Sequence, residues 1–342
     1  TAASFSTLMS GARRLSLGRP YRRTRPDAVR ATDADALLSR LSACRAGYLP
    51  PDAYADMLRG RAEAPHRPPI INIGTYLRAR EVDAHVQHFI ETGACGPPYT
   101  PAPRVQIVSL GAGSDTRFWR LRHARLARYV ELDFPSTTSQ KAAAIQAHPA
   151  LSHALADAHV TADGLVSSAY VLLGIDVSTL HQGTWERVAT YLDPALPTLL
   201  LCECVLAYMD IDVANAALRA CLATLPRASI LSYDMCISSD APHAAPTRFG
   251  QVMLQNLAAR QLTLPGARGC TSTAAYVERF EHLAGHASHL QCHAYTLRES
   301  WQQLEGEERR RVSMLERLDE VEELEMLLGH YCIAWIDRAI VQ

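Results

Sequence analysis

The segment from Val105 to Thr116 restricts the possible folds of this chain more than any other part of the sequence. An apolar run, Val105–Leu110, leads directly into Gly111-Ala-Gly-Ser-Asp-Thr, and a helical pattern follows. Gly111 and Gly113 permit a tight turn and the close approach of a ligand to the backbone. The third glycine of a dinucleotide-binding fingerprint would fall at Thr116, so that motif is incomplete. Taken alone, the turn also fits an ordinary connection between a strand and a helix.

The chain continues this alternation of strand and helix. Short apolar runs bounded by turn residues predict strands over Val105–Leu110, Tyr129–Leu132, Tyr170–Leu173, Thr198–Cys202 and Ile230–Tyr233. Helices are expected over 116–127, 136–147, 181–192 and 211–224. Strands that are apolar throughout and separated by helices are typical of a parallel sheet covered on both faces. The pattern therefore predicts a doubly wound, Rossmann-like α/β domain.

The C-terminal part of the chain extends this domain. Two helices are expected over Arg248–Arg260 and Thr271–Leu283, then a strand over His286–Tyr295, a helical block over 297–328 and a strand over Tyr331–Ile336. The late strands predict an antiparallel pair added to a mostly parallel sheet. We place the α/β domain at 104–342, with an insertion at about 235–285.

The first hundred residues have a different character. Pro-rich breaks flank a segment with apolar residues at helical spacing, including Val82, Val86 and Phe89, so we expect a helical N-terminal cap over 34–103. Residues 1–30 contain seven arginines and one acid, Asp27. This composition suits either a mitochondrial transit peptide or a basic tail. We favour a flexible basic tail over 1–33, because the stretch lacks an apolar face with helical period.

Composition excludes several classes of protein. The chain has 34 basic and 35 acidic residues, a formal charge of −1, which argues against a general nucleic-acid-binding protein. Its nine cysteines are scattered without paired Cys-x-x-Cys spacing, so we expect neither a disulfide framework nor a metal site. Buried free thiols suit a reducing compartment, and we expect a cytoplasmic protein. No apolar run reaches the roughly 18 residues of a membrane span, so we expect no membrane partner.

Acidic residues follow three of the predicted strands. Asp133 lies at the tip of the second strand, where it could accept hydrogen bonds from the hydroxyl groups of a ribose. Asp176 and Glu203 close the third and fourth strands. Each acid alone would fit a helix cap or a turn, but together they predict a ligand crevice at the carboxyl edge of the sheet. Asp115, in the first turn after the glycines, would repel a phosphate, which favours S-adenosylmethionine over NAD.

Several blocks of the sequence resemble the leucine carboxyl methyltransferases. They are Pro68–Arg78, Val108–Leu121, Glu131–Pro135, Pro197–Met209, Arg248–Met253, Leu318–Glu325 and His330–Trp335. The resemblance runs in order from about residue 34 to 336. It implies the class I fold of S-adenosylmethionine-dependent methyltransferases. It also implies methylation of the C-terminal leucine carboxylate of the catalytic subunit of protein phosphatase 2A, so the expected partner is the tail of that subunit.

The resemblance also implies roles for particular residues. Arg78 and Arg40 would pair with the methionine carboxylate of the cofactor, and Glu203 would contact its methionine portion. The remaining expected cofactor contacts are Gly111 and Gly113 at the turn, Asp133 at the ribose, and Asp176 with Val177 at the adenine. Tyr208 lies where a hydroxyl could face the substrate.

One departure from the family affects the substrate side. Relatives have Asp-Leu-Arg-Asp-Leu after the third strand, whereas this chain has Asp176-Val-Ser-Thr-Leu180. If that arginine holds the substrate carboxylate in relatives, Ser178 cannot replace it.

Methyl transfer to a carboxylate needs little acid–base help. The acceptor has a reference pKa of about 3.3–3.7 and is ionised at neutral pH, so we expect no catalytic histidine or cysteine. We expect the protein to act as a monomer. The alternatives are a family member that methylates a small carboxylate, a non-catalytic scaffold that binds the phosphatase tail, and an NAD-dependent oxidoreductase. An NAD-dependent oxidoreductase would need a catalytic lysine beside a histidine or tyrosine. Such an arrangement is hard to build here, because Lys141 is the only lysine of the chain.

Overall fold

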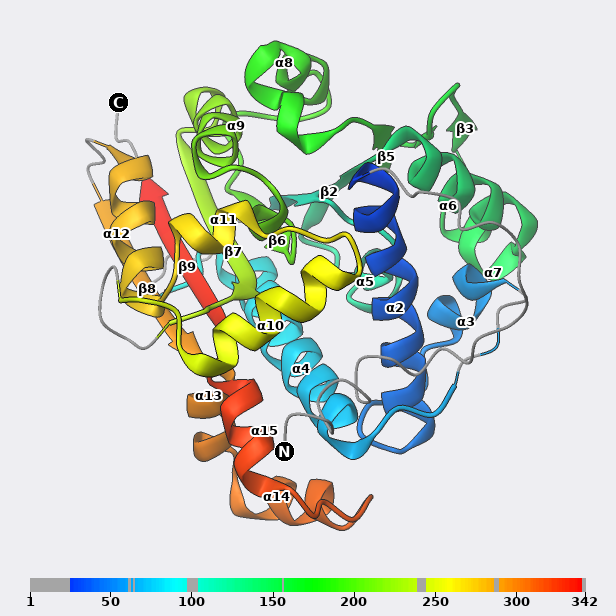
Figure 1. Cartoon of the computed structure of the whole chain (residues 1–342). Coiled ribbons are helices and arrows are strands. Elements are labelled where there is room, and N and C mark those ends of the chain that lie inside the picture. The colour runs from blue at the N-terminus through cyan, green and yellow to red at the C-terminus, as the bar shows by residue number, and fades with distance from the viewer. Residues whose placement is uncertain are drawn as a thin grey trace, which may run out of the picture.

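The computed structural model describes residues 25–60, 63, 65–96, 104–155, 157–238, 244–285 and 289–339. Most of the predicted basic tail therefore lies outside the described residues. Within these ranges, nine strands form one sheet in the order β3-β4-β5-β2-β1-β6-β7-β9-β8. Helices cover both faces of this sheet (Figure 1). No helix among the described residues has the length and apolar character needed to cross a bilayer.

The centre of the sheet is parallel. Its five strands are β5 (Tyr170–Gly174), β2 (Leu126–Asp133), β1 (Val105–Leu110), β6 (Thr198–Glu203) and β7 (Arg227–Met235). At one edge, β9 (Tyr331–Ala339) and β8 (His289–Thr296) are antiparallel, and at the other edge β3 (His159–Val160) and β4 (Leu165–Val166) form a short antiparallel hairpin. The predicted fold class is therefore confirmed. The order of strands reverses between β1 and β6, and ligands bind at this switch point in open α/β sheets.

Two hydrophobic cores flank the sheet, one on each face. In β1, Val105 and Ile107 contribute to the first core, and Val108 and Leu110 contribute to the second, as the alternation of side chains along a strand requires. The first core includes residues of α4 (Pro69–Thr92), α6 (Pro135–Ala147), α7 (Pro149–Ser152), α13 (Leu297–Gln303), α14 (Gly306–Ser313) and α15 (Val321–Leu328). The second includes residues of η2 (Val177–Gln182), α8 (Thr184–Ala189), α9 (Ile211–Thr224) and α12 (Thr273–Ala284).

The N-terminal cap consists of α2 (Arg25–Arg45), α3 (Ala53–Arg59) and α4. Because α2 begins at Arg25, the prediction of a flexible tail as far as residue 33 is wrong for its last residues. Leu37 and Leu41 of α2 pack with Ala55 of α3, and these apolar contacts hold α2 against the rest of the cap.

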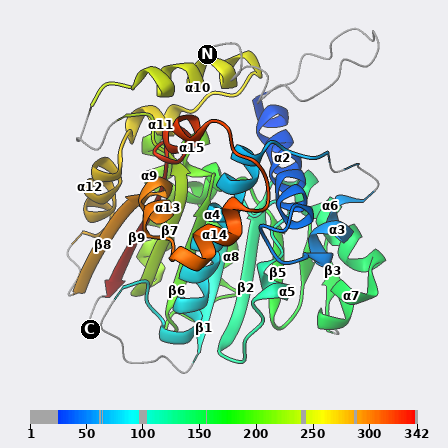
Figure 2. The same cartoon turned by 90° about the horizontal axis from the view of Figure 1, so that it is seen from below.

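The insertion after β7 contains α10 (Arg248–Ala259), α11 (Pro265–Gly269) and α12. Met253 and Leu257 of α10 share a small core with Ala28 of α2. Figure 2 shows α10 and the first turns of α2 at the end of the sheet toward which the parallel strands point. The insertion and the N-terminal helix thus enclose the same edge of the sheet.

Three helix predictions need correction. The segment predicted to be helical over 116–127 forms only α5 (Arg117–Arg120), because Leu126 already belongs to β2 and pairs with Val105. The segment over 181–192 is divided at Gly183, whose φ of 92° ends η2 before α8 starts. The block over 297–328 forms three helices, because one straight helix would extend about 48 Å, whereas its buried apolar residues, from Leu297 to Leu328, join the same core.

Candidate active site

A cavity of about 1410 Å³ lies at the carboxyl edge of the parallel strands, and all the residues predicted to contact cofactor or substrate line it. They are Arg40, Arg78, Gly111, Gly113, Asp133, Asp176, Val177, Glu203 and Tyr208. Small-molecule sites usually measure roughly 300–1000 Å³. The larger volume leaves space for a cofactor together with the end of a second reactant.

The glycine turn forms the floor of this cavity. Gly111 has a φ of 66°, and a Cβ atom at this position would lie 2.7 Å from Cγ2 of Val205. Gly113 has a φ of 49°. Both positions therefore favour glycine for their conformation, and at both a Cβ atom would also lie too close to a neighbouring side chain.

Asp133 holds the glycine turn against the end of β2. Its Oδ2 accepts the N–H of Gly113 at 2.8 Å, and its Oδ1 accepts the N–H of Phe134 at 2.7 Å. Burial raises the pKa of Asp133, and the nearby charge of Asp33 raises it further, whereas these backbone bonds lower it, with a net rise. Each carboxylate oxygen can accept more than one hydrogen bond, so Asp133 can also accept from a ribose.

Asp176 combines a structural role with its position in the cavity. It is the N-cap of η2, and its Oδ1 accepts the N–H of Ser178 at 2.9 Å and the Ser178 hydroxyl at 2.7 Å. The helix-cap explanation that applies to a single acid is therefore correct for this residue, although it also lines the cavity with Val177. Because the Ser178 hydroxyl is already bonded, it supplies no replacement for the arginine of relatives.

Arg78 and Glu203, predicted separately, pair with each other. Nε of Arg78 donates to Oε1 of Glu203 at 2.5 Å, and Nη1 of Arg117 donates to Oε2 at 2.6 Å. Burial alone would raise the pKa of Glu203, but the guanidinium groups of Arg117 and Arg78 outweigh it and lower the pKa. The guanidinium of Arg78 also lies over the ring of Tyr233, 5.1 Å from its centroid, and Tyr233 stacks on Tyr331 at 5.6 Å.

A wider ion-pair network supports this pair, and sequence reasoning missed its members. Nε of Arg117 donates to Oδ1 of Asp83 at 2.7 Å, and Nη1 of Arg120 donates to Oδ2 of Asp83 at 2.6 Å. Both arginines belong to α5, immediately after the glycine turn. Arg117 also contacts Asp115 at 3.1 Å. The only sequence signal for this network was the presence of two arginines one helical turn apart beside the glycine motif.

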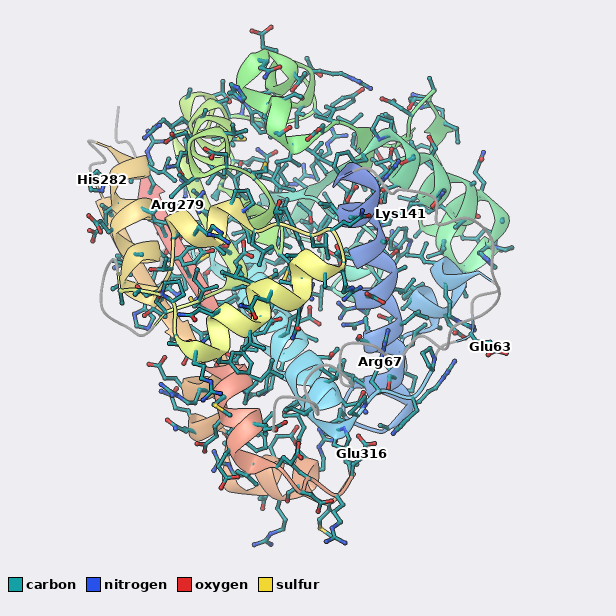
Figure 3. The ribbon with its side chains drawn as sticks, in the orientation of Figure 1. Glu63, Arg67, Lys141, Arg279, His282 and Glu316 are labelled. Carbon is teal, nitrogen blue, oxygen red and sulfur yellow. The ribbon has the colours of Figure 1, made fainter. Side chains whose placement is uncertain are left out.

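Asp115 is committed to the protein interior. Its carboxylate accepts the backbone N–H of Arg117 at 2.9 Å and the hydroxyl of Tyr129 at 3.0 Å. Lys141, labelled in Figure 3, donates to the carbonyl oxygen of Asp115 at 2.6 Å and to Oε2 of Glu131 at 2.5 Å. Burial raises the pKa of Glu131 to about 7, although Lys141 opposes this shift. The only lysine of the chain thus supports the glycine turn from below.

Arg40 reaches the cavity from α2 and also binds the start of α3, the next helix of the cap. Its Nε donates to Oδ2 of Asp52 at 2.7 Å. Asp52 is the N-cap of α3, where its Oδ1 accepts the N–H of Ala55 at 3.0 Å, and its Oδ2 also accepts the hydroxyl of Thr116. This arrangement joins the cap to the residue that follows the glycine turn.

The turn after β6 carries two further residues of the cavity wall, Cys204 and Tyr208. Cys204 has a φ of 54°, which ends the strand, and its N–H donates to the carbonyl oxygen of Tyr233 at 2.7 Å. Strand alternation alone would put Cys204 on the same face of the sheet as the buried Cys202, but the change of φ places it on the cavity wall. Tyr208 lies in the short helix η3 (Leu206–Tyr208), which the buried carboxylate of Asp234 holds by accepting the N–H of Ala207 at 3.0 Å.

A parallel sheet with a glycine turn at its switch point, and with carboxylates at the ends of neighbouring strands, defines a class I methyltransferase fold with a cofactor site. A sequence profile described as leucine carboxyl methyltransferase matches residues 24–222. A protein named leucine carboxyl methyltransferase 1 from Mycosarcoma maydis is 36% identical, and the alignment covers 91% of this chain and 78% of that protein. The protein of the same name from Rattus norvegicus is 31% identical, with 91% and 90% covered. This chain therefore belongs to the leucine carboxyl methyltransferase family.

Family membership makes the chain a methyltransferase that uses S-adenosylmethionine to methylate a carboxyl group. The residues in the cavity fit that cofactor. Carboxylates suit a ligand with hydroxyl donors and a cationic sulfur, and Arg78 suits a ligand carboxylate. The NAD-dependent alternative is set aside.

Proposed function

We propose that this chain methylates the C-terminal leucine α-carboxylate of the protein phosphatase 2A catalytic subunit, acting in the cytoplasm as a monomer. The single observation that carries the proposal is the arrangement of one cavity. Asp133 lies at one part of its wall, the Arg78–Glu203 pair at another, and Tyr208 lines the same space.

The methionine portion of the cofactor is assigned to the charged part of the wall. Arg78 pairs with Glu203 through Nε, which keeps its two Nη groups for a bidentate bond to the methionine carboxylate. Glu203 accepts from the amino group, and Arg40 adds a second positive charge near the carboxylate. Because Glu203, itself held by Arg117, already fixes Arg78, little side-chain entropy is lost on binding.

The adenosine portion is assigned to the strand ends. Asp133 accepts from the ribose, while Asp176 and Val177 border the adenine. Gly111 and Gly113 let the ligand approach the backbone of the turn, since neither carries a side chain. These positions are proposals from the resemblance, supported by the shared cavity.

The chemistry follows from charge and position. The cofactor supplies a methyl group on a positively charged sulfur. A bond forms between an oxygen of the substrate carboxylate and the methyl carbon, while the carbon–sulfur bond breaks and its electron pair stays on sulfur. Because two opposite charges are neutralised, a site that excludes water favours the reaction, and no general base is needed. The protein contributes orientation of the two reactants.

The substrate side of the cavity suits an apolar terminal residue. Met253, Leu257 and Leu262 from the insertion line it, as does Tyr208. We propose that these apolar side chains contact the leucine side chain of the substrate. We also propose that the Tyr208 hydroxyl forms a hydrogen bond with the substrate.

Transfer of radiolabelled methyl groups tests the proposal directly. We expect base-labile label on the phosphatase catalytic subunit, and none on a subunit that lacks its last leucine or ends in an amide. Equal labelling of the shortened subunit would overturn the substrate assignment. Label on small carboxylates alone would favour the small-molecule alternative, and cofactor binding without any transfer would favour the scaffold.

Substitution of Arg78 tests the cofactor assignment. Arg78→Ala should lower the affinity for S-adenosylhomocysteine roughly 10- to 100-fold, because charge-assisted hydrogen bonds contribute about 1.5–3 kcal/mol. Arg78→Lys should recover only part of the loss, since a lysine cannot form the bidentate pair. Calorimetry measures both variants, and equal losses would contradict a bidentate contact.

A further inference from the structure

Helix α2 forms one wall of the cavity, although the sequence pattern assigned its first residues to a tail. Residues 29–40 line the cavity together with the glycine turn. Figure 2 shows the start of α2 at the same end of the sheet as α10. The contacts of this helix with the turn are polar, and they centre on one side chain, Asp33.

Both oxygens of Asp33 bind the residue that follows the second glycine. Oδ1 accepts the N–H of Ser114 at 2.7 Å, and Oδ2 accepts the Ser114 hydroxyl at 2.8 Å. A Cβ atom on Gly113 would lie 2.3 Å from Oδ1 of Asp33. The absence of a side chain at Gly113 thus admits a carboxylate from α2, in addition to permitting the turn.

Asp33 and Asp133 therefore place two carboxylates on consecutive residues of the glycine turn. Asp133 accepts the N–H of Gly113, and Asp33 binds the next residue along the chain. Throughout the part of the chain that the structure describes, no ion pair connects either carboxylate to a basic side chain. Two like charges side by side repel each other, and a ligand that offers hydroxyl donors or positive charge would relieve this repulsion.

We propose that Asp33 is a further cofactor-binding residue, which accepts one ribose hydroxyl while Asp133 accepts the other. The ribose has two adjacent hydroxyl groups, which matches two adjacent carboxylates. The oxygens of Asp33 retain acceptor capacity after binding Ser114. This inference deepens the proposed function, since it requires that an adenosyl cofactor occupies this cavity.

The same turn of α2 also contacts the substrate side. Thr32 lines the same cavity as Tyr208, and Asp35 forms an ion pair with Arg260 at the end of α10. Binding of a ribose by Asp33 would hold α2 on the glycine turn and, through its neighbours, on the wall where the substrate arrives. Cofactor binding should therefore precede substrate binding.

Calorimetry with S-adenosylhomocysteine and its 2′-deoxy and 3′-deoxy forms tests the contact. Asp33→Ala and Asp33→Asn should lower the affinity for S-adenosylhomocysteine about tenfold or more. Asp56→Ala on the neighbouring cap helix α3 is the control, because Asp56 lies outside the cavity wall and pairs with Arg59 at an exposed position. It should change the affinity less than about threefold.

A double-mutant cycle distinguishes a direct hydrogen bond between Asp33 and the ribose from an indirect effect of Asp33 on the structure of the site. For one of the two deoxy ligands, the loss caused by removing the hydroxyl should largely disappear in the Asp33 variants, because the partner is already gone. Amide exchange in 29–40 should slow on ligand binding in the original chain and not in Asp33→Ala. Fully additive losses for both deoxy ligands would overturn the proposal. If the original chain binds no S-adenosylhomocysteine, the proposed function fails, whereas normal binding in Asp33→Ala contradicts this inference alone.

Discussion

The part of the cavity wall that we assign to adenosine (the adenosine part) and the part that we assign to methionine (the methionine part) are held together in different ways. Near Asp133 and Asp176, carboxylates accept hydrogen bonds from the backbone of neighbouring turns, such as the N–H groups of Phe134 and Ser178. Near Glu203, carboxylates meet guanidinium groups from distant parts of the chain, and Arg78 lies 125 residues from its partner. The first part forms as the strands end. The second forms only when the cap has docked on the sheet.

This difference predicts how each part responds to substitution. A backbone-bound carboxylate can lose its charge while an uncharged oxygen still accepts one of its N–H groups. A buried ion-pair network has no such tolerance, because removal of one member leaves opposite charges without partners. Substitutions should therefore separate stability from binding.

The largest effect is expected for Arg117→Ala. Arg117 is almost fully buried and contacts Asp83, Asp115 and Glu203. Its removal should lower the free energy of unfolding by about 3–5 kcal/mol, as for other broken buried pairs, and should also abolish cofactor binding. Urea denaturation measures the stability. Arg120→Ala, which shares Asp83 at a more exposed position, is the control and should cost less.

An intermediate effect, mainly on binding, is expected for Asp133→Asn. The amide oxygen can accept the N–H of Gly113, but the amide NH2 group cannot accept the N–H of Phe134, so the free energy of unfolding should fall by about 1–2 kcal/mol. The affinity for S-adenosylhomocysteine should fall roughly five- to tenfold, because a neutral acceptor binds ribose hydroxyls more weakly than a carboxylate. A large loss of stability in this variant would show that the two parts do not differ as described.

The smallest effect concerns pH. Burial raises the pKa of Glu131 to about 7, above its ordinary value of 4.5. Between these values the folded chain binds more protons at Glu131 than the unfolded chain, so this group makes stability fall as pH rises. Glu131→Gln should flatten the dependence of the urea midpoint on pH between about 5 and 8.

The difference between the pH profiles of the original chain and of Glu131→Gln gives the contribution of Glu131 to stability, separate from those of other titrating groups. Burial lowers the pKa of His85 to about 4 and raises that of Asp234 to about 6, so both also contribute slopes in acid. These contributions are shared by the two proteins and cancel in their difference. Identical pH profiles would mean that Glu131 has the same pKa in both states.

Sequence reasoning located the adenosine part more completely than the methionine part. Asp133 and Asp176 follow directly from strands that their apolar runs predict, and the backbone groups they bind are close in sequence. The pairing of Arg78 with Glu203, and the partnership of Arg117 with Asp83, depend on how α4 packs against the sheet. No local pattern contains that information.

Local conformation also limited the prediction. The positive φ of Cys204 redirects a side chain that strand alternation alone would put on the same face of the sheet as the buried Cys202. Asp33 was assigned to a tail, because the start of α2 has little apolar periodicity of its own and is held by contacts with the glycine turn and the insertion. These features depend on tertiary contacts rather than on local propensity.

The stack of Tyr233 and Tyr331 beneath Arg78 determines which fragments of this chain can keep the cavity wall intact. The stretch that matches the family profile, 24–222, includes Arg78 and Glu203 but stops before both tyrosines. A truncated fragment ending there would lack β7, β9 and the aromatic platform for the guanidinium. In such a fragment, Arg78, which we assign to the methionine carboxylate, would have no aromatic ring to pack on, and the cavity would lack part of its wall.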